Sequence, residues 1–276
     1  MTALFGPVEP PSLHVMTFNL RRRMDGMAWR RADRWRIREP LVSRLVRTEM
    51  PTILGTQEAL PDQARAVLTA LGPRYRMIGR GRMTRGRGEG TPLFYDADRL
   101  RLREWEQLAL SEHPRAAGSR SWGNAIPRIA VAASFRDRAT DADLFVVNTH
   151  LDPFSPRSRV RSAEAIRSFV AAQDLPAIVT GDMNAGEDSP ALRAFVEGAT
   201  LVDAWVTAER RATPAWGTNA TYRAPTQHGP RIDWILTTPG IHVLDAGINA
   251  EPIDGGWPSD HFPVQAIVRV PAGRTA

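Results

Sequence analysis

The chain has 276 residues, enough for one large domain with a substantial buried core, and its hydrophobic (42%) and charged (24%) fractions are ordinary for a globular protein. It contains no cysteine, which excludes a disulfide scaffold, a thiolate zinc site and a cysteine nucleophile. The formal net charge is +6 and the sequence contains Arg but no Lys, so the charge favours phosphorylated or polyanionic partners without by itself establishing nucleic-acid binding.

No linker rich in Ser or Gly divides the chain. We therefore expect a single domain over residues 13–271, a flexible lead-in over residues 1–12 and a short tail over residues 272–276. The lead-in lacks the basic and apolar parts of a secretion signal, and no apolar run is long enough to span a bilayer. These features predict a cytoplasmic protein with no membrane insertion and no obligate protein partner.

The predicted elements are many strands and few helices. In chain order, the predicted strands cover residues 14–20, 52–57, 92–95, 100–105, 128–135, 144–148, 231–236, 241–245 and 264–270. The predicted helices cover residues 39–48, with Pro40 in the first turn, 62–71, 158–173, and a segment that starts after Asp188 or Ser189 and ends at Gly198. Without strict alternation of strands and helices, this order predicts sheets packed on each other and covered by helices.

One segment, IVTGDMN at residues 178–184, ends an apolar run with a carboxylate and a carboxamide two positions apart. In an extended backbone, this spacing points the side chains of Asp182 and Asn184 to one face. Asp182 could take a proton from water or hold a metal ion, and Asn184 could donate hydrogen bonds to a developing anionic oxygen. The segment therefore predicts a polar site at the end of a buried strand.

Four other apolar runs carry polar residues in the same way, and a later turn adds two more. The runs HVMTFN, TILGTQE, LFVVNTHLD and RIDWIL and the turn PSDHFP carry Asn19, Glu58, His150 with Asp152, Asp233, and Asp260 with His261. A single Asn or His of this kind more often satisfies a turn or a sheet edge. So many polar groups at strand ends are together typical of a functional site.

These motifs, in this order, resemble the endonuclease/exonuclease/phosphatase superfamily. PLFYDADRL, GSRSWGNAIPRIA, NTHLD and GDMN are most similar to a largely uncharacterised bacterial branch of it, and the resemblance extends over nearly the whole chain. It implies the deoxyribonuclease-I-like α/β sandwich, in which two packed, mainly antiparallel sheets are flanked by helices in four layers. It also implies a metal-dependent phosphoesterase that hydrolyses a phosphomonoester or phosphodiester by in-line attack of an activated water.

The resemblance further implies a hard divalent cation, Mg²⁺ or Mn²⁺, held by oxygen ligands. Glu58 would supply a carboxylate to this metal site, and Asn19 and Asp260 would complete or support it. Asp182 would activate the water, and Asn184 would hold that water or the developing oxyanion.

Two histidines flank the scissile phosphate in the family pattern, and here they are His150 and His261. They would stabilise charge on the nonbridging oxygens or assist the leaving group. Asp233 would accept a hydrogen bond from His261 and favour its protonated form. Tyr95 matches a family position that contacts phosphate, and Asp152 would support the residues that touch the substrate.

The remaining features leave alternatives open. Arg128 could clamp phosphate or brace the sheet, and His228 could line the pocket. Arg21 to Arg23 could add positive potential at the mouth of the site. The Arg-rich segment 79–90, GRGRMTRGRGEG, is expected to be a mobile loop that grips a polyanion, closes over a small phosphate or is simply solvated.

The substrate also stays open at this point. A phosphorylated small molecule, such as a sugar-phosphate-like ester, is expected before nucleic acid, so a nuclease is the alternative. A noncatalytic phosphate-binding scaffold would be marked by loss of Asp182 or Glu58, and both are present. An Arg-rich nucleic-acid binder would bind in a salt-dependent way without turnover.

Overall fold

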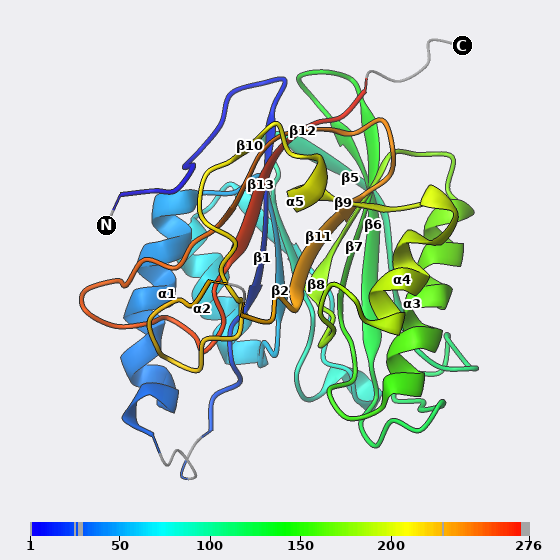
Figure 1. Cartoon of the computed structure of the whole chain (residues 1–276), viewed down its shortest axis with the longest axis horizontal. Coiled ribbons are helices and arrows are strands. Elements are labelled where there is room, and N and C mark those ends of the chain that lie inside the picture. Colours follow the sequence, from blue (N-terminus) through cyan, green and yellow to red (C-terminus); the bar gives the residue numbers. More distant parts are fainter. Residues whose placement is uncertain (1, 25, 27–29, 228, 272–276) are drawn as a thin grey trace.

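Two β-sheets packed face to face form the centre of the molecule (Figure 1). The structure is a computed structural model that describes residues 2–24, 26, 30–227 and 229–271. The first sheet contains β1 (Leu13–Asn19), β2 (Ile53–Gln57), β3 (Tyr75–Ile78), β4 (Leu93–Asp96), β10 (Arg210–Arg211), β12 (His242–Ile248) and β13 (Val264–Arg269). The second contains β5 (Leu100–Ala109), β6 (Ile129–Asp137), β7 (Asp143–His150), β8 (Ala177–Asp182), β9 (Val202–Asp203) and β11 (Asp233–Thr237).

The strand order is β10-β12-β13-β1-β2-β4-β3 in the first sheet and β5-β6-β7-β8-β11-β9 in the second. Most neighbouring strands run antiparallel, whereas β1 with β2, β7 with β8 and β10 with β12 run parallel. The helices are α1 (Trp35–Glu49), α2 (Pro61–Leu71), α3 (Pro156–Ala171), α4 (Pro190–Val196) and the short α5 (Ala204–Thr207). Single 3₁₀ turns cover Arg31–Asp33, Thr84–Gly86 and Glu197–Ala199.

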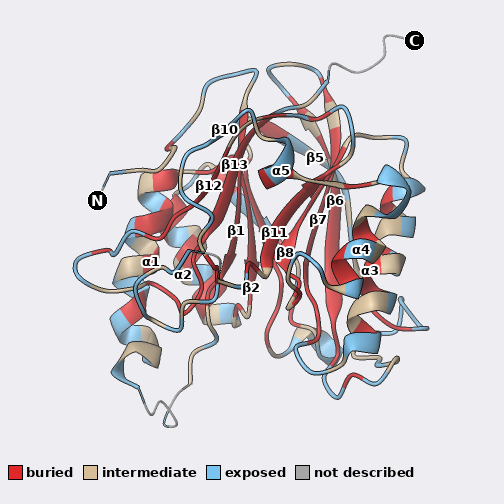
Figure 2. Cartoon of the chain, viewed as in Figure 1, coloured by how far each residue is buried: buried red, intermediate tan, exposed pale blue. Residues whose placement is uncertain are grey.

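Three hydrophobic clusters hold the layers together. Val15 and Val146 belong to the cluster between the two sheets. Trp234 belongs to the cluster beneath α3 and α4, and Leu45 and Phe94 belong to the cluster beneath α1 and α2. The strands are accordingly buried along most of their length, while the helices keep one exposed side (Figure 2). This arrangement confirms the predicted four-layer sandwich with mainly antiparallel sheets.

The inward faces of the central strands change from apolar to polar towards one end of the sandwich. Alternate residues of a strand share a face, so Ile178, Thr180 and Asp182 of β8 all point between the sheets. Asn148 and His150 of β7 lie beside Thr180 and Asp182 in the parallel register. The side chains that form the site therefore stand at the end of each strand, on the same face as the hydrophobic side chains further along it.

A buried polar layer separates the hydrophobic centre from that end. The Asn148 Oδ1 accepts hydrogen bonds from Gln57 Nε2 (2.8 Å) and Thr180 Oγ1 (3.1 Å), and Gln57 Nε2 also donates to Thr17 Oγ1 (3.0 Å). The Asn148 Nδ2 donates to the carbonyl oxygen of Thr56 (2.9 Å). Because Gln57 and Thr56 belong to β2 and Asn148 to β7, these bonds join the two sheets.

Helix α1 begins earlier than the sequence predicts. It starts at Trp35, so Pro40 lies inside the helix and not in its first turn. The added turn is held by tertiary contacts, because the fully buried Arg38 donates to the carbonyl oxygens of Leu20 and Arg21. Those contacts offset the hydrogen bond that Pro40 cannot donate.

Two segments predicted to be mobile or flexible are hydrogen-bonded. In the lead-in, the amides of Leu4 and Gly6 donate to the buried Glu49 carboxylate at 2.8 and 3.2 Å. In the Arg-rich segment, the Gly81 amide donates to Gly86 (3.1 Å) and closes a hairpin. The predicted tail over residues 272–276 lies outside the described residues. Strand β3 was not predicted, since its short run has two exposed positions in the middle and gains its partner only from β4.

Gly55 lies at a close contact between the two sheets and gives a test of this packing. A Cβ at Gly55 would lie 2.5 Å from Thr180 Oγ1 and 2.6 Å from Asn148 Oδ1. We expect Gly55→Ala to lower the free energy of unfolding by about 1–3 kcal/mol, as overpacked substitutions do. Urea denaturation measures the change, and Gly186→Ala is the control because a Cβ there meets nothing within 4 Å. Equal stability of the two variants would contradict the close sheet contact.

Candidate active site

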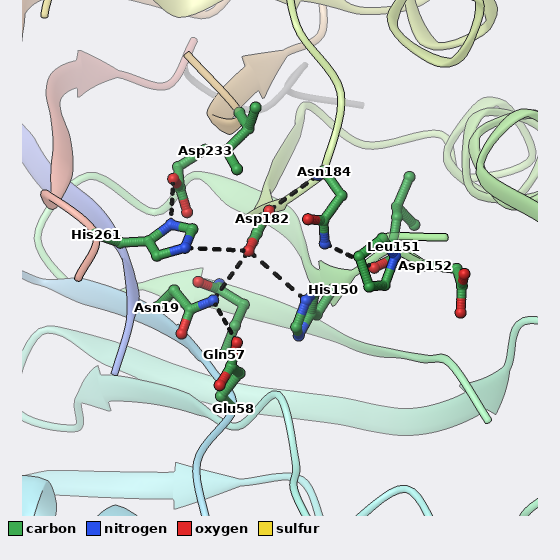
Figure 3. A network of polar contacts seen from close by, with 12 residues as sticks. Asn19, Gln57, Glu58, His150, Leu151, Asp152, Asp182, Asn184, Asp233 and His261 are labelled. Carbon is green, nitrogen blue, oxygen red and sulfur yellow. Dashed lines mark hydrogen bonds and ion pairs between the residues drawn. The ribbon is translucent and has the colours of Figure 1, made fainter. Parts of the chain in front are cut away.

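The polar ends of the central strands converge on one cluster of side chains (Figure 3). Asn19 ends β1, His150 ends β7, Asp182 ends β8 and Asp233 begins β11. Because β11 runs antiparallel to β8, Asp233 lies directly opposite Asp182, and His150 lies opposite Asp182 on the other side. The register of β7, β8 and β11 thus brings His150, Asp182 and Asp233 together. Asn19 reaches Asp182 from the other sheet.

Asp182 lies at the centre of the cluster. Its Oδ2 accepts a hydrogen bond from Asn19 Nδ2 (2.9 Å) and lies 3.6 Å from His150 Nε2 and 3.9 Å from His261 Nε2. Its Oδ1 accepts the backbone amide of Asn184 (2.9 Å). Burial, with the negative charge of Asp233 nearby, raises the pKa of Asp182 to about 7. Asp182 can therefore exchange a proton near neutral pH.

Asp233 and His261 form a buried pair beside Asp182. The Nδ1 of His261 lies 2.8 Å from Asp233 Oδ2. Burial alone would lower the pKa of His261, but the Asp233 carboxylate raises it to about 10. This imidazole is therefore a cation at neutral pH, as the sequence predicts, and its Nε2 faces Asp182.

His150 has the opposite character. Burial lowers its pKa well below the usual value, and the positive charges of Arg128 and Arg82 lower it further, although Glu58 opposes them. At neutral pH His150 is thus an uncharged imidazole that can donate one hydrogen bond. The two histidines of the site therefore carry different charges.

Glu58 follows β2 in a left-handed backbone conformation (φ 56°), which turns the chain at the edge of the cluster. Its carboxylate accepts the backbone amide of Arg22 (2.9 Å) and the side-chain amide of Asn19 (3.1 Å). Burial would raise its pKa, but these two hydrogen bonds and the positive charge of His261 keep the pKa below its usual value. Glu58 is therefore ionised, and the Asn19 amide nitrogen bridges it to Asp182.

Glu58, His150, Asp182 and His261 line an open cavity of about 350 Å³. Its lining is polar or charged almost throughout and consists of Arg21, Arg22, Met24, Glu58, Arg82, Glu89, Arg128, His150, Pro153, Asp182, Asn184, Asn219, Asp260 and His261. A larger hollow of about 480 Å³ lies near Trp35 and Glu39 but lacks the Asp and His cluster. We therefore place the functional site in the smaller cavity.

Comparison with known proteins shows the family of the chain. Residues 16–261 match the endonuclease/exonuclease/phosphatase family. The chain belongs to this family. Its members act as phosphatases, phosphodiesterases or nucleases, so the chain is an enzyme that acts on phosphate ester bonds. A search of curated proteins found no match.

Solved structures of the endonuclease/exonuclease/phosphatase family superimpose over most of the chain. A family protein from Bacteroides thetaiotaomicron is 31% identical with a TM-score of 0.87, covering 95% of this chain and 98% of its own. A mannosyl-6-phosphatase from the same organism is 30% identical with a TM-score of 0.85, covering 93% of this chain and 99% of its own. D. rerio TDP2 complexed with single-strand DNA product is 16% identical with a TM-score of 0.72, covering 94% and 99%, and shows the shared fold alone.

The backbone of Asn184 is not extended, although the sequence pattern predicts that it is. Strand β8 ends at Asp182, and Asn184 adopts a left-handed conformation (φ 47°) instead of continuing the extended backbone. Its amide therefore reaches Asp182, while its Nδ2 donates to the Leu151 carbonyl oxygen (3.0 Å). Asn184 still lines the cavity, but through the turn and not through strand alternation.

Tyr95 is not brought to the site, which corrects its predicted contact with phosphate. It is buried in the cluster between the sheets, packs on Phe135 with ring centroids 4.9 Å apart, and pairs with Ile53 at the end of β2 remote from Glu58.

Asp260 does line the cavity, and its Oδ2 lies 3.4 Å from Arg21 Nε. His228 lies outside the described residues.

Arg128 and Asp152 form a buried pair at the cavity wall. Arg128 Nε lies 3.3 Å from Asp152 Oδ2, and Asp152 Oδ1 accepts the amides of Phe154 (2.9 Å) and Ser155 (2.8 Å). Arg128 both braces the Asp152 turn and faces the cavity. Sequence reasoning assigned no role to Glu89 or Asn148, although Asn148 stands in the NTHLD motif that was singled out.

The contact between Asp233 and His261 gives a direct titration test. In the metal-free protein, NMR of the imidazole should show His261 protonated up to about pH 10. We expect Asp233→Asn to lower its pKa by about 1–3 units, because the opposite charge is lost. Glu209→Gln is the control, since Glu209 pairs with the exposed His242. A His261 that titrates near 6.5 in the unmodified protein would refute the charged pair.

Proposed function

We propose that this enzyme is a divalent-metal-dependent phosphatase that releases phosphate from a small phosphorylated molecule by attack of an activated water. The central position of Asp182 carries the proposal, because this proton acceptor faces His150 and His261 at the wall of a cavity that also holds an ionised Glu58. The similarity to a mannosyl-6-phosphatase, at 30% identity over 93% of the chain, supports a sugar-phosphate-like substrate.

The donor atoms suit a hard cation such as Mg²⁺ or Mn²⁺. Glu58 and Asp260 offer carboxylate oxygens at the cavity wall, which is the ligand type that these ions prefer. We assign Glu58 as the main ligand, with Asp260 and Asn19 supporting it; the Asn19 nitrogen already donates to Glu58 and Asp182, and its Oδ1 accepts the Arg21 amide (2.9 Å). The ion would supply Lewis-acid stabilisation of the phosphate oxygens.

A second group of possible ligands consists of Asp182, Asp233 and His261, whose donor atoms lie within 4.8 Å of one another. The His261 ring bonds Asp233 through Nδ1 (2.8 Å) and has its Nε2 3.9 Å from Asp182 Oδ2, so both ring nitrogens face carboxylates. We therefore assign these three residues to proton transfer and charge stabilisation, and not to metal binding.

The protein residues divide the remaining chemistry. Asp182 would take the proton of the attacking water, held in place by Asn19 and by the Asn184 amide. The charged His261 would donate from Nε2 to a phosphate oxygen, and the neutral His150 would donate to another. The phosphoryl oxygens would thus accept hydrogen bonds from the two histidines, while the water would donate its proton to Asp182.

A nuclease would use the same residues, and the alternative stays a prediction because the similarity to the DNA-bound structure concerns the fold alone. The scaffold hypothesis is weakened, because the cavity retains both Asp182 and Glu58. Among the described residues, no helix combines the length and apolar character needed to cross a membrane.

Replacement of the proton acceptor tests the mechanism. We expect Asp182→Asn to lower the rate of p-nitrophenyl phosphate hydrolysis with Mg²⁺ by at least about 100-fold, the typical contribution of a general base. Thermal unfolding should be unchanged or shifted upward, because a buried negative charge beside Asp233 is removed. Asp174→Asn, at an exposed position, is the control. Full activity of the Asp182→Asn protein would exclude the assigned role.

Replacement of the metal carboxylate tests the cofactor. Glu58→Gln should raise the Mg²⁺ concentration that gives half-maximal activity by about 10-fold or more, because a hard cation loses an anionic ligand. The measurement is a Mg²⁺ and Mn²⁺ titration after chelator treatment, with the exposed Glu251→Gln as control. Hydrolysis that persists in chelator and is insensitive to Glu58→Gln would contradict the metal dependence.

A further inference from the structure

In the Arg-rich hairpin over residues 79–90, one arginine, Arg82, lines the active-site cavity, and the other three do not. Arg82 is largely buried, with a side chain 11% exposed, whereas Arg85 and Arg87 are exposed. Arg80 is also exposed and lies over the Trp105 ring, 5.5 Å from its centroid. The four arginines therefore do not form one polyanion-binding surface.

Backbone bonds fasten the hairpin next to the metal carboxylate. The amides of Ala59 and Gly90 donate to each other's carbonyl oxygens at 3.2 and 2.8 Å, which places the end of the hairpin beside Glu58. The Arg82 amide donates to the Glu89 carbonyl oxygen (2.8 Å), and the side chains of the two residues form an ion pair (2.8 Å). Arg82 is thus held in place before any ligand binds.

Arg128 faces the same cavity from the other sheet. Its side chain is 4% exposed, and Nε is bonded to Asp152. Its Nη1 is buried without a hydrogen-bond partner among the described residues. A buried guanidinium nitrogen without an acceptor is costly, so this atom requires an acceptor that the described residues do not supply.

Three arginines and three carboxylates meet at this wall, and the third carboxylate, Glu58, is the one assigned to the metal ion. The described ion pairs join three arginines to two carboxylates: Arg22 and Arg82 share Glu89, and Arg128 pairs with Asp152. Arg82, Arg128, Glu58 and His150 also line one further cleft of about 10 Å³, so the two guanidinium groups are neighbours. An anionic oxygen placed between them would accept from the two arginines and supply the acceptor that Arg128 Nη1 lacks among the described residues.

We propose that Arg82 and Arg128 bind the terminal oxygens of a phosphomonoester dianion and so select monoesters over diesters. This inference rests on the proposed phosphatase function and specifies its substrate class. A monoester carries three terminal oxygens and a charge near −2 at neutral pH. In a diester a second organic group is bonded to one of those oxygens and removes one charge, which leaves one guanidinium fork without its acceptor.

The test uses the full chain and two independent readouts. Isothermal calorimetry measures binding of inorganic phosphate to the protein, with and without Mg²⁺, and steady-state kinetics compares p-nitrophenyl phosphate with bis-p-nitrophenyl phosphate. We expect Arg82→Met to weaken phosphate binding and to raise the monoester KM by about 10-fold to 100-fold, the loss that a charge-assisted hydrogen bond predicts. Diester kinetics should change less than about 3-fold.

Two further variants separate binding from folding. Arg82→Lys keeps the partner of Glu89 but not the fork, so it should fold as the unmodified protein does and still weaken phosphate binding by about 3-fold or more. Arg85→Met, in the same hairpin but exposed, should leave all values unchanged. Unfolding is followed by circular dichroism, and Arg82→Lys decides the outcome if Arg82→Met does not fold.

Each result has one meaning. Unchanged phosphate binding in Arg82→Lys and Arg82→Met overturns the inference, as does an unmodified enzyme that prefers the diester or variants that impair both esters equally. Absence of hydrolysis of either ester by the unmodified protein would overturn the proposed function instead. The binding measurement with inorganic phosphate would then still show whether Arg82 contacts phosphate.

Discussion

The side chain of Asn148 is the contact on which the geometry of the site depends. This buried amide accepts from Gln57 and Thr180 and donates to the backbone of the opposite sheet, so it fixes the two sheets to each other one layer beneath the active site. Every one of its polar atoms is satisfied only in one relative position of the sheets. Glu58 follows Gln57 and His150 lies two positions after Asn148, so their separation is set by the same contact.

Residues of the same type in the site differ in charge state because their surroundings differ. Glu58 is a half-buried acid and Asp182 a buried one: hydrogen bonds from Arg22 and Asn19 keep Glu58 ionised, whereas burial beside Asp233 raises the pKa of Asp182 to about 7. The histidines are divided in the same way, because Asp233 charges His261 while burial and Arg128 keep His150 neutral. Pairs whose pKa values are pushed apart in this way place two different carboxylates, a cation and a neutral donor within one cavity, as the proposed mechanism requires.

The sequence predicted the fold and the strand-end residues well, because both depend on local pattern. An apolar run of strand length that ends in Asp or His places that residue at a strand end, and the family motifs supply the order of the strands. Tyr95 was misplaced because its register against Ile53, and not its neighbours in sequence, decides which end of the sheet it occupies. The inward turn of Arg82 was not predictable either, since it depends on the pairing of Ala59 with Gly90 and on the Glu89 carboxylate, which local composition does not reveal.

The polar groups of the site lie at strand ends, where left-handed turns direct backbone amides to them. Arg21, Glu58 and Asn184 all adopt positive φ values between 47° and 56°, a region that costs a non-glycine residue about 1–2 kcal/mol. In two of these turns the strained residue directs its own amide at the site: Arg21 donates to Asn19 Oδ1 and Asn184 to Asp182 Oδ1, each at 2.9 Å. The turn at Glu58 instead brings its carboxylate to the Arg22 amide at 2.9 Å. Within a sheet these amides would be used by the neighbouring strand, so only where the ladder ends can the backbone itself orient and charge-stabilise the acids of the site.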